Sequence, residues 1–224
     1  MNERHSVDTF RGKVYDHLKK MINARKLEPG EFIDLNLIGE ELGMSRTPLR
    51  DALFHLENEG FITIYPRRGV MLNALSLRDV KNIYEIVGAL EGAALMSARK
   101  SLDNTDIDRM DELDKEMARC LDAGDLDTHY RLNVDFHDVF LLKSDNPELV
   151  RTARVQRERL YDFPQRRALI PDWERCNLDE HREIVKYLEH GDFTGASDYL
   201  RDVHWSYEVQ EKFIKQYYFS RTDA

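Results

Sequence analysis

Three histidines and an asparagine in the second half of the chain have the side chains and spacing to bind a metal ion. Asn133 and His137 are four residues apart, so on a helix their side chains lie on one face, one turn from each other. His181 and His204 fall in two later helical segments. Histidines from separate helices can converge in the core of a bundle, which is one way in which metal sites are built. Neutral imidazole suits Zn, Ni, Cu or Fe, and an oxygen ligand also admits Mn or Mg.

The same residues have an ordinary structural explanation. The chain contains eight histidines, and a single histidine on a helix is more often a surface residue than a ligand. His129, four residues before Asn133, is an alternative ligand, but it lies roughly 12 Å along a helix from His137. We therefore expect His129 to be exposed. Spacing alone leaves the metal site and a set of unrelated surface histidines both open.

A second group of residues could bind nucleic acid. Residues 45–50 read Ser-Arg-Thr-Pro-Leu-Arg. Arg46 and Arg50 are four apart and share one face of a helix, and Ser45 is a favourable N-cap. Hydroxyl and guanidinium groups in the first turn of a helix are suited to phosphates and base edges. The plain alternative is a surface helix that happens to carry two arginines.

The segments around residues 45–50 have the layout of a winged helix. Residues 34–44 form a short amphipathic segment with a glycine near its end, and residues 51–59 continue a second helix. The β-rich run 61–65 is followed by a turn with Arg67 and Arg68, and residues 70–72 can return as the second strand of a hairpin. A basic hairpin after a helix-turn-helix places cations where a wing meets phosphate or the minor groove.

Residues from about 14 to 72 resemble the N-terminal domain of GntR-type bacterial transcription regulators. The matching segments are Leu27-Glu-Pro-Gly30, Leu42-Gly-Met-Ser-Arg-Thr-Pro-Leu-Arg-Asp-Ala-Leu53, Leu56-Glu-Asn-Glu-Gly60 and Arg67-Arg-Gly-Val70. The resemblance implies contacts with operator DNA from the recognition helix and from the wing. The predicted DNA-binding residues are Ser45, Arg46, Thr47, Arg50, Arg67, Arg68 and Gly69.

The remainder of the chain has helical periodicity and no convincing strand. We predict six helices that form an antiparallel all-helical bundle. Their approximate ranges are 76–100, 104–122, 126–142, 147–167, 171–190 and 194–217. The fold class is therefore mainly α, with an N-terminal winged helix-turn-helix. The predicted domains are 1–73 for DNA binding, a linker at 74–76, a helical domain at 77–217 and a C-terminal tail at 218–224.

Most of residues 76–216 resemble the FCD effector-binding domain of the FadR subfamily. The matching pieces are Tyr84-Glu-Ile-Val-Gly-Ala-Leu-Glu91, Asn133-Val-Asp-Phe-His137, Asn146-Pro-Glu-Leu149, His181-Arg-Glu-Ile184 and Gly191-Asp192. Six helices look more like the VanR-type branch. The resemblance implies a divalent metal, Zn, Ni or Mn, held by Asn133, His137, His181 and His204, and a small organic acid as effector.

Two departures from the FCD pattern affect the effector pocket. Asn133 supplies an amide where a carboxylate would neutralise charge, so the ion is left more positive and should favour an anionic ligand. Relatives often carry an arginine that points into the pocket at the position of Val87. The candidate replacements are Arg131, Arg154 and Arg201; alternatively, an apolar part of the effector lies against Val87.

Composition is that of a soluble globular protein, and we expect it to be cytoplasmic. The net charge of −9 comes from residues 74–224, because residues 1–73 contain equal numbers of basic and acidic side chains. DNA attraction must therefore come from a local patch and should fall steeply with salt. No apolar run is long enough to cross a membrane, and we see no secretion signal. Cys120 and Cys176 have no metal-binding spacing and are expected to be buried and reduced.

The residues and the two resemblances together favour a homodimeric DNA-binding regulator and not an enzyme. We expect a repressor that binds a pseudo-palindromic double-stranded operator and is released by its effector. One alternative is a metal-dependent hydrolase with a DNA-binding appendage, which would need a general base beside the metal. The other is a DNA binder that responds to no effector and carries a structural metal.

Overall fold

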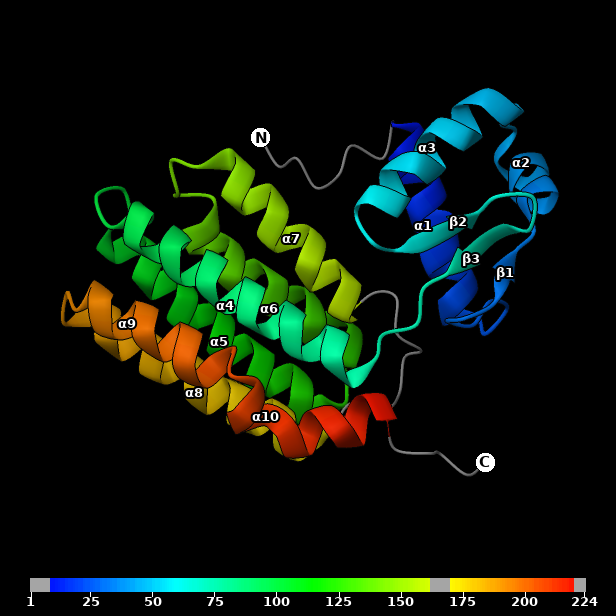
Figure 1. Cartoon of the computed structure of the whole chain (residues 1–224). Coiled ribbons are helices and arrows are strands. Elements are labelled where there is room, and N and C mark those ends of the chain that lie inside the picture. The colour runs from blue at the N-terminus through cyan, green and yellow to red at the C-terminus, as the bar shows by residue number, and fades with distance from the viewer. Residues whose placement is uncertain (1–8, 162–169, 220–224) are drawn as a thin grey trace. The chain divides into compact units, whose positions relative to one another are not determined.

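The computed structural model describes residues 9–161 and 170–219. They form two compact units (Figure 1): residues 9–76 together with residues 158–161 at the end of one helix, and residues 77–157 together with residues 170–219. The first unit contains a small sheet and three helices, and the second is made of helices alone. The mainly helical fold class with a winged N-terminal unit is thereby confirmed. No helix among the described residues is both long and apolar enough to cross a membrane.

The first unit has the elements of a winged helix-turn-helix in the predicted order. They are α1 (Phe10–Asn23), β1 (Phe32–Ile33), α2 (Leu35–Leu42), α3 (Arg46–Asn58), β2 (Ile62–Tyr65) and β3 (Gly69–Leu72). The three strands form an antiparallel sheet in the order β1-β3-β2. Its hairpin β2–β3 is the wing.

Local signals in the sequence explain where α2 ends, where α3 begins and which face of α3 is exposed. Asp34 caps α2 by accepting from two backbone amides, and Gly43 ends α2 with a left-handed φ of 60°. Ser45 takes the N-cap position of α3, as predicted, but its side chain makes no capping hydrogen bond. The buried stripe of α3 contains Leu49, Ala52, Leu53 and Leu56. These residues fix one face of α3 against the unit, so the opposite face is exposed.

The second unit contains the predicted bundle. Its helices are α4 (Leu77–Ala98), α5 (Asn104–Ala123), α6 (Leu126–Leu141), α7 (Pro147–Tyr161), α8 (Pro171–Glu189), α9 (Phe193–Tyr199) and α10 (Tyr207–Ile214), with π-helical segments η1 (Leu200–His204) and η2 (Lys215–Phe219). The predicted end of the fourth helix near residue 167 lies outside the described residues, as does most of the predicted tail. Cys120 is half-buried and Cys176 is exposed, so the prediction of two buried thiols was wrong.

The sixth predicted helix is interrupted, and the interruption positions His204, one of the predicted metal ligands. The backbone N–H of Trp205 donates to Leu200 O at 2.9 Å, a π-type bond that adds one residue to the turn. Ser206 then caps the start of α10. Trp205 lies against α4, where a β-carbon on Gly88 would be 2.9 Å from the Trp205 Cβ. The π turn therefore directs both His204 and Trp205 into the core, where each is less than a tenth exposed.

Candidate metal centre and DNA-binding surface

Three of the predicted metal ligands meet inside the helical unit. His137 on α6, His181 on α8 and His204 in η1 each place a ring nitrogen within 4.8 Å of the other two. The three ring centroids lie 4.9 to 5.3 Å apart. All three side chains are buried. The helices thus bring together residues that are up to 67 positions apart in the sequence.

Two of these rings are oriented by carboxylates at Nδ1. His137 Nδ1 lies 2.7 Å from Glu91 Oε2, and His204 Nδ1 lies 2.8 Å from Glu180 Oε2. The second oxygen of Glu180 accepts from Gln210 Nε2 at 2.7 Å. A carboxylate at Nδ1 fixes the ring tautomer and leaves Nε2 as the nitrogen that can bind a metal.

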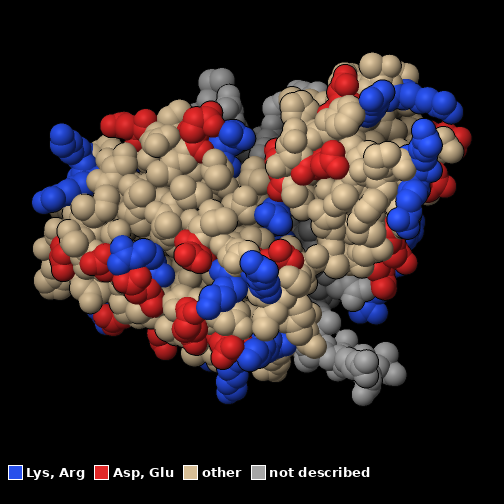
Figure 2. Space-filling model, in the orientation of Figure 1, with Lys and Arg blue, Asp and Glu red and all other residues tan. Residues whose placement is uncertain are grey.

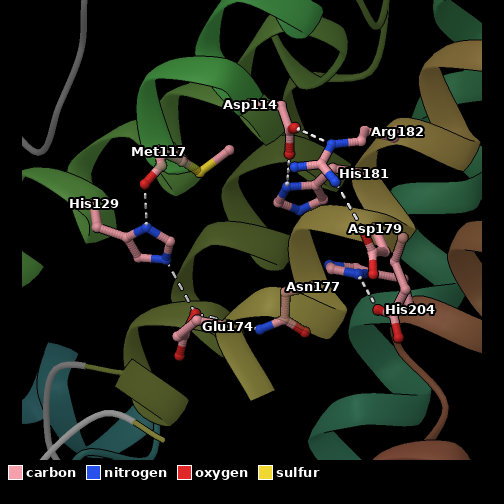
Figure 3. Close-up of polar contacts among 10 residues, drawn as sticks. Asp114, Met117, His129, Glu174, Asn177, Asp179, His181, Arg182 and His204 are labelled. Atoms are coloured by element: carbon pink, nitrogen blue, oxygen red, sulfur yellow. Dashed lines mark hydrogen bonds and ion pairs between the residues drawn. The ribbon is translucent and has the colours of Figure 1, made fainter. Parts of the chain in front are cut away.

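The third ring has a looser partner. His181 Nδ1 lies 3.6 Å from Asp114 Oδ1, which is too long for a hydrogen bond (Figure 3). The other oxygen of Asp114 accepts from Arg182 Nε at 3.0 Å. Burial raises the pKa of Asp114 to about 6, although Arg182 opposes the shift. Asp114 is therefore positioned to orient His181 but is less firmly bound to it than Glu91 is to His137.

The chemistry of the cluster fits a divalent metal ion. The Nε2 atoms of His137 and His181 are buried and have no hydrogen-bond partner among the described residues. Burial lowers the pKa of His137 to about 4, and it lowers the pKa of His181 well below the ordinary value. Both rings are therefore neutral near pH 7, which is the form that binds metals. A buried polar atom without a partner is costly, and metal ligation would remove that cost.

The fourth predicted ligand lies on the same helix. Asn133 is half-buried on α6, one helical turn before His137. Its side chain has no hydrogen bond among the described residues, so no competing partner holds it. Its role as a ligand stays a prediction.

His129 does not lie where the sequence suggested. We expected an exposed side chain, but His129 is buried, with 3% of its surface exposed. Its Nδ1 lies 3.0 Å from Met117 O, and its Nε2 lies 3.1 Å from Glu174 Oε2 (Figure 3). Both ring nitrogens are thus used in linking α5, α6 and α8. Sequence spacing could not show this, because Glu174 is 45 residues away.

Glu91 contacts the histidine cluster, although the sequence did not single it out. This fully buried carboxylate contacts His137, accepts from Trp205 Nε1 at 2.8 Å and pairs with Arg157 Nη1 at 3.3 Å. Burial opposes ionisation, but His137 and Arg157 outweigh it and lower the pKa of Glu91 to about 2. Arg157 on α7 is 4% exposed, so its guanidinium lies in the core of the helical unit beside Glu91.

The four predicted effector contacts are dispersed. Arg131 is exposed and donates to Thr128. Arg154 is half-buried and pairs with Asp138 at 2.8 Å. Arg201 is largely exposed and pairs with two aspartates on its own segment, while Val87 is fully buried. No hydrogen bond or ion pair joins the three arginines to the histidine cluster in the part of the chain that the structure describes.

Glu91→Gln should weaken metal binding by about 10- to 100-fold, as is typical when a carboxylate behind a ligating histidine is lost. The substitution removes the charge that orients His137 and breaks the ion pair between Glu91 and Arg157. Zinc affinity can be measured by competition with a chromophoric chelator. The matched control is Glu85→Gln, which changes an exposed glutamate of the same helix. Equal zinc affinity of both variants and the unsubstituted protein would exclude this role.

The predicted DNA-binding side chains of α3 lie on its exposed face. Arg46, Thr47 and Arg50 are exposed and opposite the buried stripe. The Arg50 guanidinium lies 5.1 Å from the centre of the Phe54 ring. Neither arginine has an ion-pair partner among the described residues, so both remain available to phosphates or bases.

The wing presents two further cations at its tip. Arg67 and Arg68 are exposed in the turn between β2 and β3, and Gly69, the first residue of β3, is exposed as well; Arg67 has a φ of 63° and Gly69 a φ of 118°. Figure 2 shows Lys and Arg side chains along the edge of this unit that carries the wing. A chain whose net charge is −9 would need such a local patch to attract DNA.

Two family descriptions match the chain and together span both units. Residues 10–72 match the family of bacterial regulatory proteins called the gntR family, and residues 82–203 match the FCD domain. The families and relatives are transcriptional regulators and not enzymes.

Two curated relatives are similar to the chain over more than half of its length. The chain is 32% identical to the uncharacterized HTH-type transcriptional regulator YdhC of Bacillus subtilis over 61% of this chain, and the match spans 62% of that protein. It is 30% identical to the Nta operon transcriptional regulator of Aminobacter aminovorans, over 71% of this chain and 74% of that protein.

Solved structures agree with the fold. The structure of McbR/YncC from Escherichia coli superimposes with a TM-score of 0.67 at 23% identity, covering 92% of this chain and 95% of that one. A putative GntR regulator from Rhodococcus sp. RHA1 gives a TM-score of 0.64 at 17% identity, covering 92% and 98%. At these identities the likeness establishes the fold alone.

Proposed function

Because the chain belongs to the gntR family of bacterial regulatory proteins and carries an FCD domain, we propose that it is a repressor controlled by a small carboxylate. In this proposal the effector binds beside a divalent metal in the helical domain, residues 77–217. That domain is joined through residues 74–76 to the DNA-binding domain, residues 1–73. The observation that carries the proposal is the convergence of three buried histidines, two of which have unpaired Nε2 atoms.

The metal would be held by His137, His181 and His204, with Asn133 as the fourth ligand. Zn, Ni or Mn suits imidazole and amide donors. When bound, the ion would supply positive charge and open coordination positions that attract a carboxylate. Since none of the four ligands carries a negative charge, the ion's charge is not cancelled by its own ligands. Small organic acids such as hydroxy acids, sugar acids and dicarboxylates are therefore the effector class.

Arg157 supports an anionic effector more strongly than the arginines chosen from the sequence. It is buried, and it pairs with Glu91, whose other contacts include His137. Its positive charge also helps to lower the pKa of both His137 and His181. We propose that Arg157 performs the role of the arginine that relatives carry at the position of Val87.

We further propose that the protein acts as a homodimer on a pseudo-palindromic operator. Each recognition helix would enter one half-site, with the spacing of half-sites set by the symmetry of the dimer. Ligand binding releases the operator only if the carboxylate prefers one arrangement of the two DNA-binding domains. We propose that effector binding relieves repression.

The effector class can be tested with zinc-loaded protein and a panel of lactate, malate, succinate and gluconate. We expect at least one acid to raise the unfolding temperature and to release a duplex recovered by the protein from a random pool. Arg157→Lys should retain zinc but bind that acid about tenfold or more weakly, because lysine lacks the planar fork of arginine.

Arg154→Lys is the matched control on the same helix, since Arg154 pairs with Asp138 instead. If Arg154→Lys no longer binds the acid and Arg157→Lys still does, Arg157 is not the residue that binds the effector. If no acid changes operator affinity although zinc is bound, the protein is an effector-independent DNA binder with a structural metal.

A further inference from the structure

One arginine of the wing lies against two aromatic rings. The Arg68 guanidinium carbon is 5.5 Å from the centre of the Tyr65 ring and 6.0 Å from that of Phe32. The two rings are themselves 6.0 Å apart and tilted by 56°. A guanidinium at this distance from a ring face is attracted by the ring quadrupole. Of the wing cations Arg67 and Arg68, only Arg68 has such contacts among the described residues.

The strand register explains how rings on the two outer strands meet. Phe32 on β1 pairs with Met71 on β3, and Tyr65 on β2 pairs with Gly69 on β3. Met71 and Gly69 are two apart, so both pairs lie on one face of the sheet. Gly69 has no side chain, and a β-carbon there would be 3.5 Å from Phe32 Cδ1. The glycine thus leaves the space over the central strand into which the Phe32 ring extends.

This face of the sheet is not the one that supports the core. The buried residues Ile33, Val70 and Leu72 alternate with Phe32, Gly69 and Met71, so they point to the other face. Phe32 is 48% exposed although phenylalanine usually gains by burial. Core packing therefore does not account for an aromatic ring at this position, whereas the contact with Arg68 does.

We propose that Phe32 and Tyr65 are positioning residues that orient Arg68 for insertion into the minor groove beside each half-site. Restricting the side chain before binding lowers the entropy lost on association. An inserted arginine favours A·T base pairs, because their narrow minor groove has an enhanced negative potential. The aromatic pair would thus add a base preference at a position that α3 does not read. This inference rests on the proposed contact of the wing with DNA.

A double-mutant cycle tests the proposal. Full-length unsubstituted protein, Phe32→Ala, Arg68→Ala and the double variant are titrated with the duplex that the unsubstituted protein selects from a random pool. With Arg68 present, Phe32→Ala should weaken binding by about three- to fivefold, the range expected of an exposed cation–π contact. In the Arg68→Ala variant, Phe32→Ala should weaken DNA binding no further. Phe32→Trp should restore affinity, and Phe10→Ala, at another exposed aromatic of this unit, should leave it unchanged.

The preference for A·T over G·C pairs is a second measurement, and a general loss of protein stability would not change it. Replacing A·T by G·C pairs under the wing should weaken the unsubstituted protein and have a smaller effect on Phe32→Ala. The proposal is overturned if Phe32→Ala has no effect, or if it weakens binding equally with and without Arg68. It is also overturned if the penalty for G·C is the same in both proteins. If the pool yields no selected duplex, the DNA-binding function itself fails, which is a separate result.

Discussion

Arg46→Ala and Arg50→Ala each weaken operator binding by about 10- to 100-fold, the loss expected when an arginine that contacts a base edge or a phosphate is removed. Both side chains are exposed on the face of α3 opposite its buried stripe. Their loss should not disturb the packing of Leu49 or Leu53 against the unit. The unfolding temperature and the zinc content should therefore stay at the values of the unsubstituted protein. Binding is measured by fluorescence anisotropy of a labelled duplex.

The control for charge alone is Arg109→Ala, which removes an exposed arginine of α5 in the helical unit. It changes the net charge by the same amount and should leave operator affinity almost unchanged, because Arg109 is not among the predicted DNA-binding residues and net charge alone is screened by salt. Loss of a phosphate contact also reduces the slope of affinity against salt concentration. If both α3 variants bind the duplex as tightly as the unsubstituted protein, α3 is not the recognition helix.

The second large effect is expected in the helical unit. Saturating zinc should raise the unfolding temperature of metal-free protein by about 10 °C, because a ligand at a thousand times its dissociation constant stabilises the folded state by roughly 4 kcal/mol. In His137→Ala and in His181→Ala the increase should disappear. Each variant is compared with itself with and without zinc, so any baseline loss of packing cancels. Differential scanning calorimetry gives the two midpoints.

His190→Ala is the matched histidine control, since His190 is exposed and its ring has one hydrogen bond among the described residues, to Lys186 O. It should respond to zinc like the unsubstituted protein. A zinc response that survives in both cluster variants, or that is lost in His190→Ala, would place the metal elsewhere in the chain.

The DNA-binding unit could be predicted from the sequence because its determinants are local. Gly43 ends α2 and Ser45 begins α3. Gly69, with a positive φ, follows the turn of the hairpin directly. Each of these signals lies within a few residues of the element that it bounds. The helix boundaries of the bundle were also accessible from periodicity. The π turn could not be predicted from periodicity. It adds one residue to a turn of the helix after Tyr199, and no distinctive residue type marks that addition.

The histidines themselves could be identified, whereas their supporting residues could not. A glutamate on a helix is ordinarily solvated, and nothing near Glu91 or Glu180 in the sequence marks either as buried. Their roles depend on partners 46 and 24 residues away. Arg157 was missed for the same reason, since its partner Glu91 lies 66 residues away. Convergence of distant side chains is set by packing of the whole bundle and leaves no local pattern.

The presence of a metal at the histidine cluster is tested most directly by native mass spectrometry of protein purified without chelator or histidine tag. We predict one divalent metal ion per chain, with the added mass of a small acid, and no metal on a variant in which His137, His181 and His204 are all replaced by alanine. Protein that stays metal-free after soaking in Zn, Ni or Mn would contradict the proposal. Equal metal on the triple variant would contradict it as well.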